Sequence, residues 1–271
     1  MPELPEVETT RRGIAPYVAG ARLDGLRVSQ PRLRWPVPVE ALQATAVGAV
    51  VERVDRRAKY LLLRQGGGTI LVHLGMSGSL SLVPADLGPG THDHVDLIFG
   101  GRALRLNDPR RFGAVLWADG DVGAHPLLAR LGVEPLGSDF SGALLRAAAT
   151  GRRAPVKQLI MNAHVVVGVG NIYASEALFR AGIHPRRPAG RVSLARYERL
   201  ATAIRDVLGE AITAGGTTLR DFVGGDGRPG YFTRALQVYG RAGEPCVTCG
   251  EAVRRETLGQ RSTFFCSSCQ R

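Results

Sequence analysis

The sequence predicts an α+β protein in which a strand-rich first half precedes a helical second half and a small cysteine module. In the first half, short apolar runs are separated by glycine turns, which is typical of hairpins. After residue 140 the apolar residues recur with the period of a helix. All four cysteines lie within residues 246–271, and the 271 residues are enough for two ordinary domains with their own cores.

The chain begins with a segment that predicts a short helix. Apolar residues recur at helical spacing from Leu4 to Val18, and Pro5 suits a first turn, where its missing amide hydrogen is not needed. Glu3 and Glu6 lie three residues apart on a different face. We therefore expect a helix that flanks the strands following it.

Two pairs of strand-like segments follow, and each pair is separated by a run of glycines. They are residues 60–64 with 69–74, and residues 95–99 with 102–106. Such pairs predict β-hairpins. The first half therefore predicts a layered β domain.

The pattern changes at residues 131–139, where glycines, a proline and a serine separate the strands from an alanine-rich helical stretch. A longer helical period runs from Leu194 to Ile212 and ends at Gly215. We expect a first domain over residues 1–132, a linker over 133–139, a helical domain over 140–240 and a cysteine module over 241–271.

The charge of the chain favours a polyanionic partner. Lys and Arg number 35 against 24 Asp and Glu, which gives a net charge of +11. Phosphate contacts made by such residues release counterions and drive binding to nucleic acid. Several arginine pairs fall in turn-rich segments rather than along solvated helix faces. A basic soluble protein without a nucleic-acid partner remains the alternative.

The sequence also bears on the compartment. No segment approaches the roughly 18 apolar residues of a membrane span, and the acidic start lacks the regions of a signal peptide. The clustered cysteines cannot form a disulfide framework spread over the fold, which favours a reducing compartment. We expect a cytoplasmic protein.

The cysteine module predicts a structural zinc site. Its spacing is Cys246-x2-Cys249-x16-Cys266-x2-Cys269, so each pair can aim two thiolates at one tetrahedral ion. Unligated or disulfide-paired thiols would not explain two matching pairs. A four-thiolate site is closed, which predicts one structural Zn²⁺ and no catalytic role for it. Arg254, Arg255 and Arg261 lie between the pairs, where a hairpin could present them to phosphate.

A glycine turn precedes a predicted helix in the second half. Residues 165–171 resemble the start of a dinucleotide-binding motif, but Tyr173 stands where the third glycine would be. A tight turn that opens a helix at Asn171 is the better interpretation, with backbone amides able to hold a phosphate. An ordinary turn between helices is the alternative.

Two loops in the first half carry side chains that suit DNA. The segment 107–113 offers Arg110 and Arg111 beside Phe112, a set able to contact phosphates and stack on bases. An ordinary turn is the alternative. Met76 lies between glycines and could project as an apolar wedge, although its spacing alone favours the core. The run from His92 to His94 is interpreted as a polar strand end and not as a metal site.

The N-terminus could supply a nucleophile. If Met1 is removed, Pro2 carries a terminal secondary amine, and terminal amines have a pKa of about 8 against about 10.4 for lysine. More of such an amine is neutral at pH 7, so it can attack a sugar C1′ while Glu3 shuttles protons. The residues alone favour a proline that merely begins a helix.

Seven blocks of sequence, taken in order, closely resemble the formamidopyrimidine-DNA glycosylase family. They are residues 2–14 (PELPEVETTRRGI), 56–63 (RRAKYLLL), 73–80 (HLGMSGSL), 107–113 (NDPRRFG), 167–179 (VGVGNIYASEALF), 215–222 (GGTTLRDF) and the cysteine module. The match runs nearly from end to end. It implies an N-terminal β-sandwich, a helix-two-turns-helix domain, and a zinc finger that grips duplex DNA.

The resemblance also implies a reaction. In this family a bifunctional glycosylase and abasic-site lyase removes oxidised purines such as 8-oxoguanine and formamidopyrimidines. Pro2 would attack C1′ to form a Schiff base, Glu3 would act as general acid and base, and β,δ-elimination would cut the strand. Lys59 and Arg261 would assist near the phosphates. The resemblance implies no nucleotide or redox cofactor and a monomer.

The remaining implied roles concern DNA contacts. Met76, Arg110 and Phe112 would fill the vacated stack and read the orphaned base, which overrides the core interpretation of Met76. The further expected DNA contacts are His73, His92, Arg111, Arg152, Arg153, Lys157 and Asn171. The glycine-rich stretch after Thr217 matches the region that closes over the everted base.

Two alternatives and one departure remain. The related endonuclease VIII enzymes, which prefer oxidised pyrimidines, usually start PEGPE and lack the RRF segment, so Leu4 and residues 110–112 favour the purine enzyme. A non-catalytic zinc-ribbon DNA-binding protein would explain the charge and cysteines without Pro2 or Glu3. The family more often has aspartate at the position of Asn162.

Overall fold

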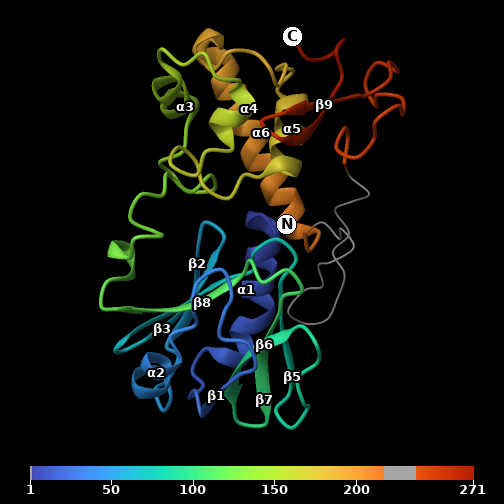
Figure 1. Ribbon diagram of the computed structural model, residues 1–271. Coiled ribbons are helices and arrows are strands. Elements are labelled where there is room, and N and C mark those ends of the chain that lie inside the picture. The colour runs from blue at the N-terminus through green and yellow to red at the C-terminus, as the bar shows by residue number, and fades with distance from the viewer. Residues whose placement is uncertain (1, 217–235) are drawn as a thin grey trace. The chain divides into compact units, whose positions relative to one another are not determined.

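The chain forms two structural units, which the computed structural model describes over residues 2–216 and 236–271 (Figure 1). Among the described residues, the first unit comprises 2–129 with 214–216, and the second comprises 130–213 with 236–271. The predicted closing region after Thr217 lies outside the described residues.

The first unit contains two four-stranded antiparallel sheets. One has the order β1-β6-β7-β5, formed by Gly25–Val28, Asp93–Phe99, Arg102–Asn107 and Ser79–Pro84. The other has the order β2-β3-β4-β8, formed by Arg53–Arg57, Tyr60–Gln65, Gly68–His73 and Ala114–Asp119. Both predicted hairpins are confirmed, as β3 with β4 and as β6 with β7. Short helical turns accompany the sheets: α2 (Val39–Ala41), η1 (Leu42–Ala46) and η2 (Val122–Ala124).

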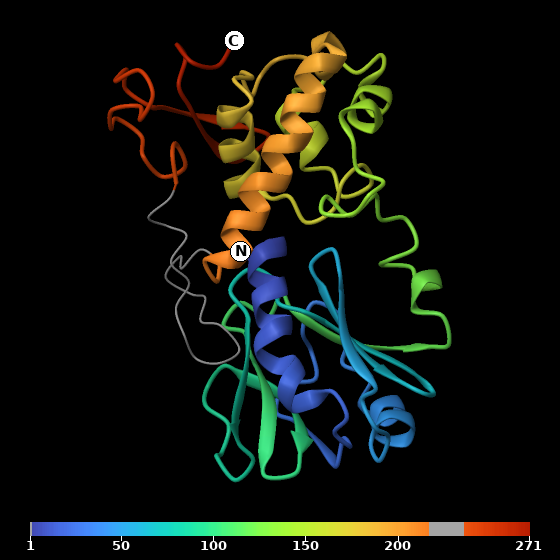
Figure 2. The same ribbon diagram turned by 180° about the vertical axis from the view of Figure 1, so that it is seen from behind.

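The predicted first helix is α1, Leu4–Val18, which packs against β2 and β3 of one sheet and β5 of the other (Figure 2). Leu4, Ile14 and Val18 are fully buried, so the periodic residues form the packed face. The helix begins with a capping box, in which the Glu3 carboxylate accepts from the backbone of Glu6 and the Glu6 carboxylate accepts from the backbone of Glu3.

The second unit is mainly helical. It contains α3 (Gly142–Ala149), α4 (Val156–Ile160), α5 (Asn171–Arg180), η3 (Ala189–Arg191), α6 (Leu194–Thr213) and the hairpin of β9 (Arg254–Leu258) with β10 (Arg261–Phe265). Helix α3 starts two residues later than the sequence predicts, because Ser141 Oγ caps it by accepting from the amide of Leu144 at 3.1 Å.

Two turns over residues 161–170 join α4 to α5, which gives the expected helix-two-turns-helix. Asn162 organises the first of these turns. Its Oδ1 accepts from the amide of His164 at 3.0 Å, and its carbonyl accepts from the amide of Val165 at 2.9 Å. An aspartate could accept the same amide bond, so the departure at Asn162 preserves the turn. Within the described ranges, no helix is long and apolar enough to cross a membrane.

Candidate functional site

The N-terminus of α1 holds the candidate nucleophile and its proton carrier. Pro2 is buried, and Glu3 is 2% exposed. The Glu3 amide donates to Glu6 Oε2 at 2.8 Å, and the Glu3 carboxylate accepts from the helix backbone. The positive end of the helix dipole also favours a carboxylate at this position. Glu3 is therefore held in place directly beside Pro2.

Lys59 lies in the two-residue turn between β2 and β3, where Arg57 pairs with Tyr60. The turn is tight, because Ala58 has a left-handed φ of 54° and is 4% exposed. Arg56 supports it by donating to the carbonyl of Ala58 at 2.9 Å.

Glu8 connects this turn to α1. Its carboxylate accepts from Arg11, Arg12 and, at 3.2 Å, from Nε of Arg56 on β2. Burial alone would raise the pKa of Glu8, but hydrogen bonds from Arg11 and Arg12 and the charges of Arg11 and Arg56 lower it to about 2. The helix that carries Glu3 and the turn that carries Lys59 are thus joined by a charged cluster.

His73, at the end of β4, lies within the field of Lys59. Burial, followed by the charges of Lys59 and Arg34, lowers the pKa of His73 to about 4, so the ring is neutral at neutral pH. Its Nδ1 accepts from the amide of Gly75 at 2.9 Å, which leaves the proton on Nε2. The ring also packs on Tyr60, with centroids 4.8 Å apart. His73 therefore offers a neutral donor and anchors the loop carrying Met76.

The structure brings the two predicted wedge loops together. At Gly75, with φ +65°, a Cβ atom would lie 2.5 Å from the amide nitrogen of Gly113, so only glycine allows this approach. Met76, which follows, is half-buried rather than part of the core. Phe112 is 42% exposed, and the Arg110 guanidinium lies 5.0 Å from its ring centroid.

Asp108 shapes the loop of Phe112, a role that our sequence reasoning missed. The residue is fully buried, and its carboxylate accepts from the amides of Gly113 at 2.6 Å and Arg110 at 3.3 Å. Its carbonyl is bonded to His94 Nε2 at 2.8 Å. The available signal was the Asn-Asp-Pro sequence, since aspartate often accepts from amides two residues on in a turn.

His92 and Arg111, two of the predicted phosphate contacts, are exposed and line one pocket of about 290 Å³ in the first unit. Its other lining residues are Ser29, Gln30, Gly90, Thr91, Asp93, His94 and Pro109. Arg111 has a left-handed φ of 56°. Phosphate contacts for these two residues remain predictions.

In the second unit, Lys157 and Asn171 form a buried junction with the zinc-finger hairpin. Lys157 is 1% exposed, and its Nζ donates to Asn171 Oδ1 at 2.7 Å and Thr263 Oγ1 at 2.8 Å. Asn171 Nδ2 donates to the carbonyl of Ser262 at 2.9 Å. These bonds fix the start of α5 against β10, directly beside Arg261. Phosphate contacts by Lys157 and Asn171 remain predictions.

The basic residues of the hairpin are presented as expected. Arg254, Arg255 and Arg261 are exposed, and Gln260 makes the turn with a left-handed φ of 59°. Arg152 and Arg153 are also exposed, in the segment before α4, and no printed contact joins them to the Lys157 junction in the described part of the chain.

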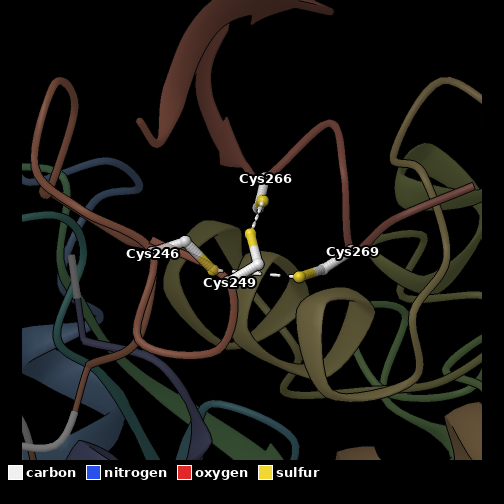
Figure 3. Close-up of side chains that lie close together, drawn as sticks. All are labelled: Cys246, Cys249, Cys266 and Cys269. Carbon is white, nitrogen blue, oxygen red and sulfur yellow. Dashed lines mark hydrogen bonds between the residues drawn. The ribbon is translucent and has the colours of Figure 1, made fainter. Parts of the chain in front are cut away.

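The four cysteines converge on one point (Figure 3). All four Sγ atoms lie within 4.8 Å of one another, with 3.9 Å between Cys246 and Cys269 and 3.5 Å between Cys249 and Cys266. Zn–S bonds of about 2.3 Å at tetrahedral angles separate sulfurs by about 3.8 Å. The donor set therefore fits one structural zinc ion, as predicted.

Glu176 on α5 is a second residue that our sequence reasoning missed. It is 1% exposed, and its carboxylate accepts from three consecutive amides, those of Gln237, Val238 and Tyr239, at 2.8–3.0 Å. This carboxylate fixes the segment that leads into the zinc finger. An acidic residue within an otherwise buried helix was the available signal.

Together, the paired antiparallel sheets, the helix-two-turns-helix and the four-cysteine hairpin define a zinc-finger protein of the helix-two-turns-helix class. Three family models match successive parts of the chain. They are the formamidopyrimidine-DNA glycosylase N-terminal domain over residues 1–115, the formamidopyrimidine-DNA glycosylase H2TH domain over 131–223, and the zinc finger found in FPG and IleRS over 243–271. The chain belongs to the formamidopyrimidine-DNA glycosylase family.

Relatives resemble the chain over its full length. The formamidopyrimidine-DNA glycosylases of Syntrophotalea carbinolica and Aromatoleum aromaticum are each 61% identical to it, with all of both chains covered. The MutM (FPG) protein from Thermus thermophilus superposes with a TM-score of 0.90 at 41% identity, covering 99% of this chain and 98% of that one. Lactococcus lactis Fpg in complex with abasic-site DNA gives 0.92 at 31% identity, covering 99% of each chain.

Proposed function

We propose that this protein is a DNA glycosylase and abasic-site lyase that removes oxidised purines from duplex DNA in base-excision repair. The observation that carries the proposal is the pairing of Pro2 with the immobilised carboxylate of Glu3 at the start of α1. The family membership supports the same reaction, and the Lactococcus lactis relative was solved with DNA containing Fapy-dG.

The amine content of the chain supports Pro2 as the nucleophile. A Schiff base needs an amine, and the 271 residues contain only two lysines, Lys59 and Lys157. The ammonium of Lys157 is buried and donates to Asn171 and Thr263. Lys59 would be protonated near its ordinary pKa of about 10.4, whereas a terminal amine titrates at about 8. Removal of Met1 would therefore create the most nucleophilic amine.

The proposed reaction proceeds in balanced steps. The Pro2 nitrogen forms a bond to C1′ as the bond from C1′ to the damaged base breaks, and the departing base takes a proton. Ring opening gives the iminium. Loss of a C2′ proton then expels the 3′ phosphate, a second elimination expels the 5′ phosphate, and water hydrolyses the iminium to release Pro2. Glu3 is placed to carry the protons.

The other site residues would bind and orient DNA. Lys59 and Arg261 would contact phosphates flanking the lesion, while Met76, Arg110 and Phe112 would fill the space left by the everted nucleotide. Zinc, when bound, supplies a structural crosslink that keeps the hairpin of Arg261 folded. We infer that the enzyme is a monomer that acts in the cytoplasm of a bacterial cell.

Borohydride trapping tests the proposal, because borohydride reduces a Schiff base to a stable covalent adduct. Purified protein, shown by intact mass to lack Met1, should be trapped on duplex DNA containing 8-oxoguanine opposite cytosine. Pro2→Gly should abolish the adduct, and Pro5→Ala, which changes a proline in the same turn, should keep it. Damaged-DNA binding without cleavage or trapping, unchanged in Glu3→Gln, would instead support a non-catalytic zinc-ribbon protein.

Substrate class is a separate comparison. The purine proposal expects cleavage of 8-oxoguanine to exceed cleavage of thymine glycol in matched duplexes. The reverse ranking would indicate an enzyme of the endonuclease VIII type, with the same trapping result.

A further inference from the structure

A basic cavity lies in the second unit, at the end of α5 opposite Asn171. It measures about 420 Å³ and is lined by His184, Arg186, Arg187, Pro188, Arg191 and Arg271. Helix α5 has ten residues and is therefore about 15 Å long. The cavity is thus separated from the junction of Lys157 and Asn171 by a helix length.

The backbone around this cavity is well fixed. The carbonyl of Arg187 accepts from the amide of Val156 at 2.8 Å, and the amide of Arg187 donates to the carbonyl of His184 at 3.0 Å. The His184 ring packs edge-on against Phe265 at 4.6 Å, and its amide donates to the carbonyl of Arg271. The arginines therefore project from a rigid frame that contains α4, β10 and the last residue of the chain.

Positive charge in the cavity exceeds its compensation. Arg186 pairs with Glu256 at 2.6 Å, but within the described residues neither Arg187 nor Arg191 has an ion pair. The neighbouring Arg196 has a buried Nε without a hydrogen-bond partner in the same described set. Burial and then the charges of Arg187 and Arg199 lower the pKa of Arg196, which is the effect expected of an unneutralised cationic cluster.

We propose that this cavity is a phosphate-binding site, distinct from the contacts proposed around the lesion. Guanidinium groups present several donors in a planar fork that suits phosphate oxygens, and a cluster of them selects polyanions over single carboxylates. The volume accommodates more than one phosphate group. The ligand is therefore a polyphosphate or successive phosphodiesters of a nucleic-acid strand, which share this chemistry.

The test uses the full-length protein and the double variant Arg187→Gln with Arg191→Gln. Glutamine removes the charge, keeps much of the stem, and leaves the backbone bond of Arg187 intact. The control is Arg22→Gln with Arg53→Gln, which removes the same charge from exposed surface ion pairs in the first unit. Tripolyphosphate binding is measured by calorimetry, and undamaged 30-base-pair duplex binding is measured against salt concentration.

The site predicts that tripolyphosphate binds the cavity variant at least about tenfold more weakly than the control variant. If nucleic acid also uses the cavity, the salt dependence of duplex binding should lose about 0.9 of slope per phosphate contact, which for two contacts is about 12-fold in affinity between 50 and 200 mM salt. An unchanged slope with weakened tripolyphosphate binding assigns the cavity to a soluble polyanion. Equal tripolyphosphate affinities and equal slopes in both variants overturn the proposal.

A measurement on the wild-type protein guards against misfolding of the variant. Tripolyphosphate should shift the NMR signals of the His184 ring more than those of His125, a histidine in the first unit. A His184 signal that does not move at saturating tripolyphosphate would also overturn the proposal.

Discussion

Replacing Glu8 with glutamine should lower the free energy of unfolding by about 3 kcal/mol at neutral pH. The basis is the pKa of Glu8, which is lowered from 4.5 to about 2 by its arginine partners, against burial, which would raise it. A shift of about 2.5 units at about 1.36 kcal/mol per unit gives the figure. The side chain is 12% exposed, so solvent screens the cluster little.

The sign of the pH dependence follows from the lowered pKa. The carboxylate contributes its full stabilisation above pH 4.5, and the contribution is lost as the pH falls towards 2. Glutamine resembles the protonated acid, so the difference between wild type and Glu8→Gln should shrink by about 1.4 kcal/mol between pH 7 and pH 3.5. Because Glu8 also joins α1 to the turn of Lys59, the variant should form the borohydride adduct more slowly.

Urea denaturation of both proteins over this pH range measures the effect, and Glu40→Gln is the control. Glu40 is exposed, so its replacement should change stability by less than about 0.5 kcal/mol. A Glu8→Gln effect that is no larger than the Glu40→Gln effect, or that stays constant from pH 7 to 3.5, would refute the reasoning.

Four further outcomes are expected. Asp108→Asn, which removes one acceptor from the loop of Phe112, should cost about 1–3 kcal/mol in urea denaturation and weaken binding to abasic-site duplex; unchanged affinity would contradict the role of Asp108. Glu176→Leu, which orphans three amides, should destabilise the zinc finger, seen as faster zinc release to a chelator. Zinc removal itself should abolish duplex binding and restore it on re-addition, and binding that survives chelation would argue against the hairpin as a grip. The ring of His73 should titrate at about 4 by NMR, and because this pKa is lowered, its contribution to stability is lost as the pH falls from 6.5 to 4.

Local patterns predicted the elements that local physics determines. Helix α1 follows from its apolar period and Pro5, and the hairpin of β3 with β4 follows from two alternating runs around glycines. The cysteine spacing predicted the zinc site for a similar reason, since each pair of ligands lies within one turn.

Long-range partners were not visible in the sequence. The bond between Glu8 and Arg56 joins residues 48 positions apart, and Glu176 binds amides more than 60 positions away. Such contacts depend on how helices and strands pack, which no local spacing encodes. Lys157 shows the same limit, because its predicted contact was phosphate while the structure reveals its bonds to Asn171 and Thr263.

Peptide mapping of the borohydride-trapped adduct tests the central claim most directly. With only two lysines in the chain, the candidate amines are the terminal amine of Pro2, Lys59 and Lys157. Mass spectrometry of the digested adduct should place the reduced sugar on the peptide that begins at Pro2. An adduct on the peptide containing Lys59, with an unmodified N-terminal peptide, would contradict Pro2 as the nucleophile.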